Sequence, residues 1–322
     1  MKEKTLHVLE YNKIIEMLRE QAGSEMTKKV ISELMPYLDA SEIREHQTET
    51  TEAVRLIQHK GPLPVGGFYD IEEIVSFARK GGTLTMAQLL KVLYNMKTAE
   101  RVKAFLKGDV PDLPVLMAIA ELIAEHRDLS AEIDRCILSE DEISDDASST
   151  LRQIRRNMKI TGERIHTQLS SLVNGSARNY LQDAVITMRN GRYCIPVKAE
   201  YKGQVPGMVH DQSSTGSTLF IEPMAVVKLN NDIRELELQE QKEIEVILAD
   251  LSQQTAAQTD SILADLNIMV QLDVIFARAA LAMDMNATEP IFNDEGRIRL
   301  KQARHPLIDK KKAVPIDIRL GD

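Results

Sequence analysis

Residues 224–289, MAVVKLNNDIRELELQEQKEIEVILADLSQQTAAQTDSILADLNIMVQLDVIFARAALAMDMNATE, contain neither glycine nor proline. Apolar side chains recur along this stretch in steps of three and four, from Leu229 and Ile233 to Leu281. This period predicts a long amphipathic helix. The polar segment 252–260 lies at its middle, where we expect the helix to bend or to be interrupted. Because a helix of this length is not stable alone, its apolar stripe must pack against another element.

The expected partner is a helix that precedes it in sequence. Asp145, Asp146 and Ser148 suit the start of a helix, where the helix dipole favours negative charge. The apolar pattern continues to about Val173, and Asn174-Gly175 is a common signal for a helix end. Between the two helices, residues 183–223 have the pattern of strands. The sequence therefore predicts two antiparallel helices that carry a small β module at one end.

The predicted strands of this module are separated by turns that contain glycine. Residues 184–188 and 193–197 are prone to form strands, and Asn190-Gly191 lies between them. Asn-Gly between two such runs is the strongest short-range signal for a β-hairpin. Residues 207–210 and 217–221 fit two further short strands. We expect a small antiparallel sheet.

The first 110 residues predict a compact helical domain. Helices are expected near residues 9–18, 26–34, 41–59, 71–79 and 85–106, with Ser41 as an N-cap. Residues 115–126 predict another helix, and the acidic stretch 134–149 predicts an irregular or short-strand connection. A strand-like segment begins at Gly296. The chain stops at Leu320-Gly321-Asp322 without a closing element, so we expect it to be part of a larger protein.

The predicted fold class is mainly α, with long antiparallel helices and a small inserted antiparallel β module. The domains expected from these patterns are a helical core at 1–112, helical arms at 113–175 and 224–290, a β module at 176–223 and a last segment at 291–322.

The composition excludes several classes of protein. The chain has 322 residues, of which 43% are hydrophobic and 28% charged, so we expect a folded, soluble protein. The first nine residues lack the pattern of a signal peptide, and no run reaches the roughly 18 apolar residues of a membrane span. Cys136 and Cys194 lack metal-ligand spacing, which favours reduced, partly buried thiols. We expect a cytoplasmic protein without a membrane partner.

Charge is distributed unevenly in a chain whose net charge is −9. The segment from Leu151 to Gln204 contains ten basic and three acidic residues. The segment from Met224 to Asp260 contains three basic and eight acidic residues. A basic patch attracts phosphate backbones by counterion release, without reading sequence. The alternative is a solvated face whose charges are partly paired with the acidic helix that follows.

The candidate contacts to nucleic acid are basic residues of the first long helix and of the β module. Arg189 and Arg192 flank the Asn190-Gly191 turn, which is expected to project them outward. The full set is Arg152, Arg155, Arg156, Lys159, Arg178, Arg189, Arg192, Lys198 and Lys202.

No catalytic, cofactor or metal site is predicted in these residues. Lys97-Thr98 has no glycine frame and cannot form a phosphate-binding loop of the Walker type. His210-Asp211 lies near serines but lacks a nucleophile elbow, and catalytic triads are not assembled from adjacent residues. Asp141-Glu142 and Asp145-Asp146 lack the ligand spacing of a calcium loop.

Several stretches together resemble one bacterial family. Residues 209–223, VHDQSSTGSTLFIEP, resemble the segment that closes the clamp region of MutS-like proteins, and residues 303–308, ARHPLI, resemble the element that opens their ATPase domain. The N-terminal stretches 9–14, LEYNKI, 66–71, GGFYDI, and 80–84, KGGTL, resemble the MutS-II branch. The resemblance covers essentially the whole chain.

The resemblance implies a core, lever and clamp portion of a homodimeric ATPase, with residues 291–322 at the start of the ATPase domain. The family also carries an Smr nuclease-like domain, and its ATPase implies ATP and Mg²⁺ as cofactors of the whole protein. It is linked to branched DNA and suppression of recombination, and to quality control that splits collided ribosomes through contacts with ribosomal RNA. ATP hydrolysis and nuclease activity are not expected in this chain. A helical scaffold that binds protein partners remains the alternative, and a self-contained enzyme is a third reading.

Overall fold

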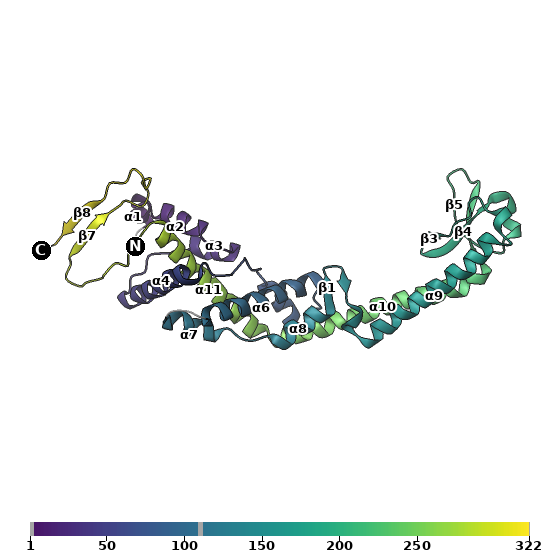
Figure 1. The fold of residues 1–322 in the computed structure, drawn as a ribbon, viewed down its shortest axis with the longest axis horizontal. Coiled ribbons are helices and arrows are strands. Elements are labelled where there is room, and N and C mark those ends of the chain that lie inside the picture. Colours follow the sequence, from purple (N-terminus) through teal and green to yellow (C-terminus); the bar gives the residue numbers. More distant parts are fainter. Residues whose placement is uncertain (1–2, 109–111, 322) are drawn as a thin grey trace. The chain divides into compact units, whose positions relative to one another are not determined.

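The computed structural model describes residues 3–108 and 112–321. The chain is mainly helical and carries three small antiparallel sheets in these residues, which confirms the predicted fold class (Figure 1). Residues 1–2 and 109–111 of the predicted core, 1–112, lie outside the described ranges, and so does Asp322.

The chain divides into two compact units. The core unit contains Met1–Gly82, Gln88–Ala131 and Gln253–Asp322, and the arm unit contains Thr83–Ala87 and Glu132–Ser252. Three of the four boundaries fall inside helices, which are α6 Met86–Lys107, α8 Arg127–Cys136 and α10 Met224–Ala257. The finer domain division drawn from the sequence remains a prediction.

Helices of the core unit surround α11, Thr259–Asp284. The others are α1 Glu3–Val8, α2 Tyr11–Glu20, α3 Glu25–Ser32, α4 Ala40–Lys60, α5 Glu72–Arg79, α6 Met86–Lys107, α7 Pro114–Leu122 and α8 Arg127–Cys136. α11 contacts α2, α3, α4, α5 and α7. Val274, Ala277 and Leu281 pack in one apolar cluster with Leu18 and Ile31.

α11 is long and apolar enough to cross a membrane by length and composition alone. Most of its apolar side chains, including Leu272, Ile275 and Ala279, are instead buried against the other helices of the core unit. Such burial is typical of the core helix of a soluble protein.

Buried carboxylates of the core unit accept backbone hydrogen bonds near helix ends. Asp273 accepts bonds from the N–H groups of Gly23 and Ser24, at 3.0 and 3.1 Å. Glu52 accepts two from the first turn of α7, and Asp265 accepts one from Ala124. These N–H groups have no partner inside their own helix or turn, so the buried acids satisfy them.

The arm unit contains two paired helices, α9 Ser149–Asn174 and most of α10 Met224–Ala257 (Figure 1). Ser148 contacts Glu243, Arg155 contacts Glu240, and the Cβ position of Gly162 lies 3.9 Å from Ile233. Residue numbers rise along one helix as they fall along the other, so the pair is antiparallel, as predicted.

The long stretch 224–289 forms two helices rather than one. α10 ends at Ala257 and α11 begins at Thr259, so the interruption falls inside the polar segment 252–260, as the sequence predicted. Gln258 at the break is not helical, with φ −109° and ψ 10°.

Some local predictions were wrong. Asp39, not Ser41, is the N-cap of α4, and its carboxylate accepts the N–H groups of Ser41 and Glu42. The stretch expected to be irregular from residue 134 begins inside α8, whose apolar positions Leu129, Ile133 and Cys136 are too few to give a clear period. The rest of that stretch forms the short strands β1 Ile137–Ser139 and β2 Glu142–Ile143 and the 3₁₀ turn η1 Asp145–Ala147.

The C-terminal segment forms a separate hairpin in the core unit. β7 Ile298–Ala303 pairs with β8 Ile316–Leu320, and Ile298 lies opposite Leu320. The sequence predicted the first strand but not the second.

Candidate nucleic-acid interface

The β module is a four-stranded antiparallel sheet in the order β3-β4-β6-β5. Its strands are β3 Thr187–Arg189, β4 Arg192–Lys198, β5 Gly207–Gln212 and β6 Thr218–Pro223, with short 3₁₀ turns η2 Arg178–Tyr180 and η3 Ala199–Gln204 beside them. Asn190 and Gly191 have φ values of 52° and 72°, which fit the predicted two-residue turn. β3 is shorter than predicted, because residues 184–186 form no strand.

One face of the sheet packs on the paired helices. The buried residues of this cluster are Ile195, Val197 and Ile221 of the sheet, Ile165, Leu169 and Val173 of α9, and Val226 and Ile233 of α10. This shared apolar core fixes the β module on the ends of α9 and α10 within the arm unit.

The sheet also contains a buried carboxylate, Glu222, with no exposed surface. Its Oε1 lies 3.0 Å from Arg192 Nη1 and accepts a hydrogen bond of 2.8 Å from Asn230 Nδ2, and its Oε2 lies 2.5 Å from His210 Nε2. Asn230 of α10 also accepts a hydrogen bond from the N–H of Tyr193 and donates one to its carbonyl. Glu222 and Asn230 thus connect β4, β5, β6 and α10.

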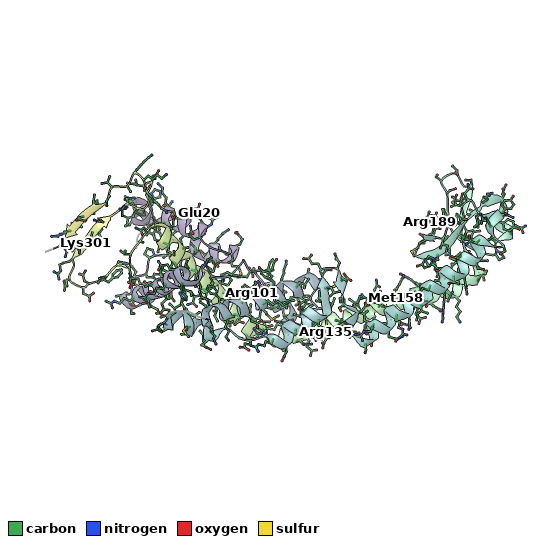
Figure 2. The ribbon with its side chains drawn as sticks, viewed as in Figure 1. Glu20, Arg101, Arg135, Met158, Arg189 and Lys301 are labelled. Carbon is green, nitrogen blue, oxygen red and sulfur yellow. The ribbon has the colours of Figure 1, made fainter. Side chains whose placement is uncertain are left out.

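The two arginines that flank the turn are not free. Arg192 is paired with buried Glu222, and its side chain is only 25% exposed. Arg189 lies on the β module (Figure 2), with its guanidinium carbon 4.0 Å from the centre of the Phe220 ring and its Nε 3.4 Å from Asp211 Oδ2. The expectation that both side chains project outward was therefore wrong, because acids on β5 and β6 face the hairpin.

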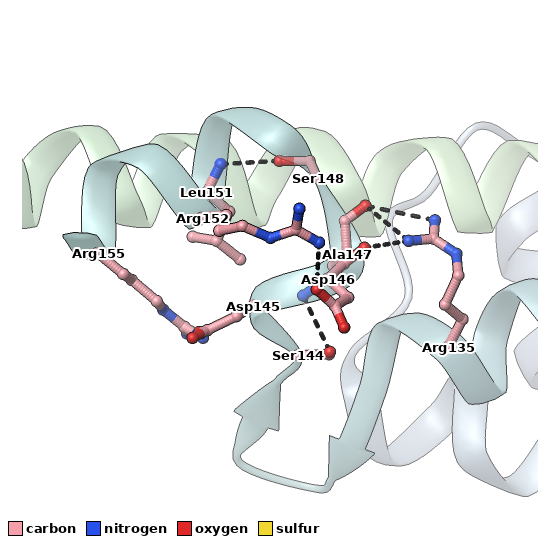
Figure 3. A network of polar contacts seen from close by, with 9 residues as sticks. All are labelled: Arg135, Ser144, Asp145, Asp146, Ala147, Ser148, Leu151, Arg152 and Arg155. Atoms are coloured by element: carbon pink, nitrogen blue, oxygen red, sulfur yellow. Dashed lines mark hydrogen bonds and ion pairs between the residues drawn. The ribbon is translucent and has the colours of Figure 1, made fainter.

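The arginines at the start of α9 also have internal partners. Arg152 pairs with Asp146, and Arg155 Nη1 lies 2.6 Å from Asp145 Oδ1 (Figure 3). Arg155 Nε lies 2.6 Å from Glu240 Oε1 of α10. Arg135 donates to the carbonyls of Asp146 and Ala147, so the entry to α9 is joined to α8 and α10.

A second group of basic residues is exposed. Arg156, Lys159, Arg178 and Lys202 form no ion pair within the described part of the chain, and all four side chains are exposed. Lys198 is half-buried, with its Nζ 5.9 Å from the Tyr201 ring centre. Of the nine basic residues selected from the sequence, these five are therefore available to an external anion, whereas Arg152, Arg155, Arg189 and Arg192 already contact acids. A role for any of the nine in binding nucleic acid remains a prediction.

The residues considered for chemistry from the sequence have other partners or surroundings in the structure. His210 contacts Glu222 rather than a serine nucleophile. No cluster of three His, Cys, Asp or Glu side chains suited to a metal ion occurs among the described residues. Cys136 and Cys194 are free and buried, and burial raises the pKa of each thiol to about 11.

The sequence reasoning did not single out Glu222, Asn230, Phe220 or Asp211 as parts of the site. A glutamate between Ile221 and Pro223 at the end of an apolar strand was a usable signal, because a buried charge requires a partner. The partner itself could not be read locally, since Arg192 lies 30 residues away.

Comparison with known proteins identifies relatives over the whole chain. The chain is 48% identical over 322 residues to the protein named Endonuclease MutS2 of Lachnospira eligens, of which it covers 40%. It is 45% identical over 324 residues to Endonuclease MutS2 of Clostridium botulinum strain Eklund 17B, and 47% identical over 326 residues to that of Agathobacter rectalis, with 41% of each covered. The chain thus spans about two fifths of the length of the curated relatives it matches. No family model matches the chain.

Proposed function

Because the chain belongs to the MutS2 family, the MutS-II branch that its sequence resembles, we propose that its arm unit binds the phosphate backbone of nucleic acid. The exposed cations of α9 and the β module are the binding surface. They comprise Arg156 and Lys159 on α9, Arg178 on η2, and Lys198 and Lys202 around η3.

The observation that carries the proposal is the unpaired state of these cations. A basic residue that already contacts a buried carboxylate has little to offer a phosphate, whereas a hydrated, unpaired one releases counterions from the nucleic acid when it binds. Arg156 illustrates the contrast, because it is exposed while its neighbour Arg155 contacts Asp145 and Glu240. Such contacts position a protein on nucleic acid without specifying sequence.

The relatives' names and the family resemblance together suggest a class of nucleic acid. The relatives are named endonucleases, which act on nucleic acid, and the resemblance to the MutS-II branch links the family to branched DNA, so we take double-stranded or branched DNA as the first candidate ligand. Cleavage, ATP hydrolysis with Mg²⁺ and assembly into a homodimer are proposed for the whole protein, outside the site described above. A role in suppressing recombination fits DNA binding. A role in rescuing collided ribosomes would use the same cations on ribosomal RNA.

Charge reversal tests the proposal. In the 322-residue chain, the combined substitutions Arg156→Glu, Lys159→Glu, Arg178→Glu and Lys202→Glu should weaken binding to a branched duplex at least about tenfold at physiological salt. The slope of log K against log salt should fall by about 0.9 for each lost phosphate contact. Binding is measured by fluorescence anisotropy, in parallel with purified ribosomes at the same salt concentration.

The matched control reverses four exposed cations of the core unit, Lys29, Arg44, Arg55 and Lys80, which form no ion pair within the described residues. This variant has the same net charge and should keep most of the affinity. Equal losses in the two variants would contradict a defined surface. Binding only to proteins, insensitive to salt and to both sets of substitutions, would favour the scaffold alternative.

A further inference from the structure

The two arginines of the β3–β4 hairpin have different roles, and we propose that Arg189 is a phosphate-binding residue whose site is occupied by Asp211 until nucleic acid replaces it. The inference rests on the proposed function. It adds Arg189 to the proposed binding surface, although the ion pair with Asp211 would otherwise exclude this residue. Arg192, by contrast, is a structural residue bound permanently to Glu222.

The guanidinium of Arg189 is held in one orientation by its surroundings. Its carbon lies 4.0 Å from the centre of the Phe220 ring, close enough for stacking and cation–π attraction. Its Nη1 donates a hydrogen bond of 3.0 Å to the carbonyl of Met188. The adjacent turn is fixed as well, because Asn190 Nδ2 donates to the His210 carbonyl at 3.0 Å. A group ordered in this way loses little conformational freedom when it binds a ligand.

Asp211 is a weak and replaceable partner for that guanidinium. Its Oδ2 lies 3.4 Å from Arg189 Nε, and the two side chains are 49% and 38% exposed. Water screens an exposed pair of this kind, so its net contribution is small. The other oxygen of Asp211 accepts the N–H of Gln212 at 2.8 Å. Rotation of the exposed Asp211 side chain away from Arg189, at the cost of this hydrogen bond, would open the position of Oδ2 to a phosphate oxygen without any change in the backbone of β5.

Arg192 shows what a permanent pair looks like in the same hairpin. Its partner Glu222 is fully buried and also contacts His210 and Asn230. Removing Arg192 would leave a buried charge short of a partner, which is costly, so exchange with an external phosphate is disfavoured. Exposure of the acid, rather than the position of the arginine beside the turn, separates the two roles.

The test removes the competing carboxylate. Asp211→Asn in the 322-residue chain should raise affinity for a branched DNA duplex about two- to fivefold at low salt, the range expected for freeing one exposed ion pair. The salt slope should steepen by up to about 0.9, because one more cation contacts a phosphate. Arg189→Ala in the Asp211→Asn background should abolish both gains.

Glu200→Gln is the matched control, because it removes one negative charge from an exposed residue of the same module that forms no ion pair within the described residues. If Glu200→Gln raises affinity as much as Asp211→Asn, net charge explains the gain and the inference is overturned. It is equally overturned if the gain survives Arg189→Ala.

Failure of the inference and failure of the proposed function give different results. If the variant with four charge reversals on α9 and the β module loses affinity but Asp211→Asn behaves like Glu200→Gln, only the inference fails. If the variant with four charge reversals binds DNA as tightly as the unchanged chain, the proposed function itself is wrong. Circular dichroism and thermal unfolding of each variant verify that the β module remains folded.

Discussion

Charged side chains of the core unit and of the arm unit illustrate two different uses of charge. In the core unit, Glu52, Asp265 and Asp273 are buried and accept backbone N–H groups of neighbouring segments. In the arm unit, Arg156 and Lys159 extend into solvent from a helix whose apolar face is covered. The difference teaches that charge content alone does not locate a binding surface. A charge that holds two elements together is not available to a ligand.

The largest expected effect comes from a buried acid of the core unit. Asp265→Ala would remove the acceptor for the Ala124 N–H and the partner of His126, at 2.9 and 3.0 Å. Breaking a buried pair in this way costs about 3–5 kcal/mol of unfolding free energy. Urea unfolding should show this loss. A loss below about 1 kcal/mol would contradict the structural role assigned to the buried acid.

Adjacent arginines sharpen the comparison inside α9. Arg155→Ala should lower stability by about 1–2 kcal/mol, because it removes a charged hydrogen-bond partner of Glu240 from a side chain that is 26% exposed. Arg156→Ala should change stability by less than about 0.5 kcal/mol, as expected for a surface substitution. Affinity for DNA should instead fall more in Arg156→Ala than in Arg155→Ala. If Arg155→Ala weakens binding more than Arg156→Ala does in folded protein, the assignment of the free surface is wrong.

The stability of the core unit should depend on pH through His126. Burial alone would lower the pKa of His126, but hydrogen bonds to Asp265 and Gln258 outweigh it and raise the pKa above the ordinary 6.5. A raised folded-state pKa stabilises the protein below the unfolded-state value, and the contribution is lost as pH rises through the folded-state value. Thermal stability should therefore fall as pH increases above about 6.5. His126→Gln should flatten this dependence, and an unchanged profile would contradict the assignment.

The smallest expected effect concerns the turn of the hairpin. Gly191 has a φ of 72°, which side chains disfavour, and no atom lies within 4 Å of where a Cβ would be. Gly191→Ala should therefore cost only about 1 kcal/mol of stability, through backbone strain without a clash. Thermal unfolding measures the loss. A change in DNA affinity larger than about twofold would show that the hairpin is coupled to binding more strongly than proposed.

Local signals predicted the long helices and the β module. The spacing of apolar residues by three and four predicted the long helices, and Asn190-Gly191 predicted the hairpin. The polar segment around Gln258 predicted the break between α10 and α11. α8 was missed because most of its residues are polar and only a few apolar positions mark its buried side. Such patterns report what a residue does within its own element, and they weaken where an element is short or polar.

The pairing of charges could not be predicted in the same way. A count over residues 151–204 treats Arg155 and Arg156 alike, yet the partner of Arg155 on α10 is Glu240, 85 residues away. Likewise, Arg189 and Arg192 both flank a tight turn, and only the register of β4, β5 and β6 brings Asp211 and Glu222 to them. Which arginines are free depends on tertiary structure, so the sequence could suggest a basic region but could not say which of its residues are unpaired.

The most direct test of the binding surface is the reactivity of individual lysines with and without DNA. An amine-reactive reagent is applied to the 322-residue chain, alone and with a saturating branched duplex, and each site is quantified by mass spectrometry. Lys159 and Lys202 should become protected in the complex, whereas Lys29 and Lys80 of the core unit should react as before. Protection confined to Lys29 and Lys80, or equal at all four sites, would contradict binding through the exposed cations of the arm unit.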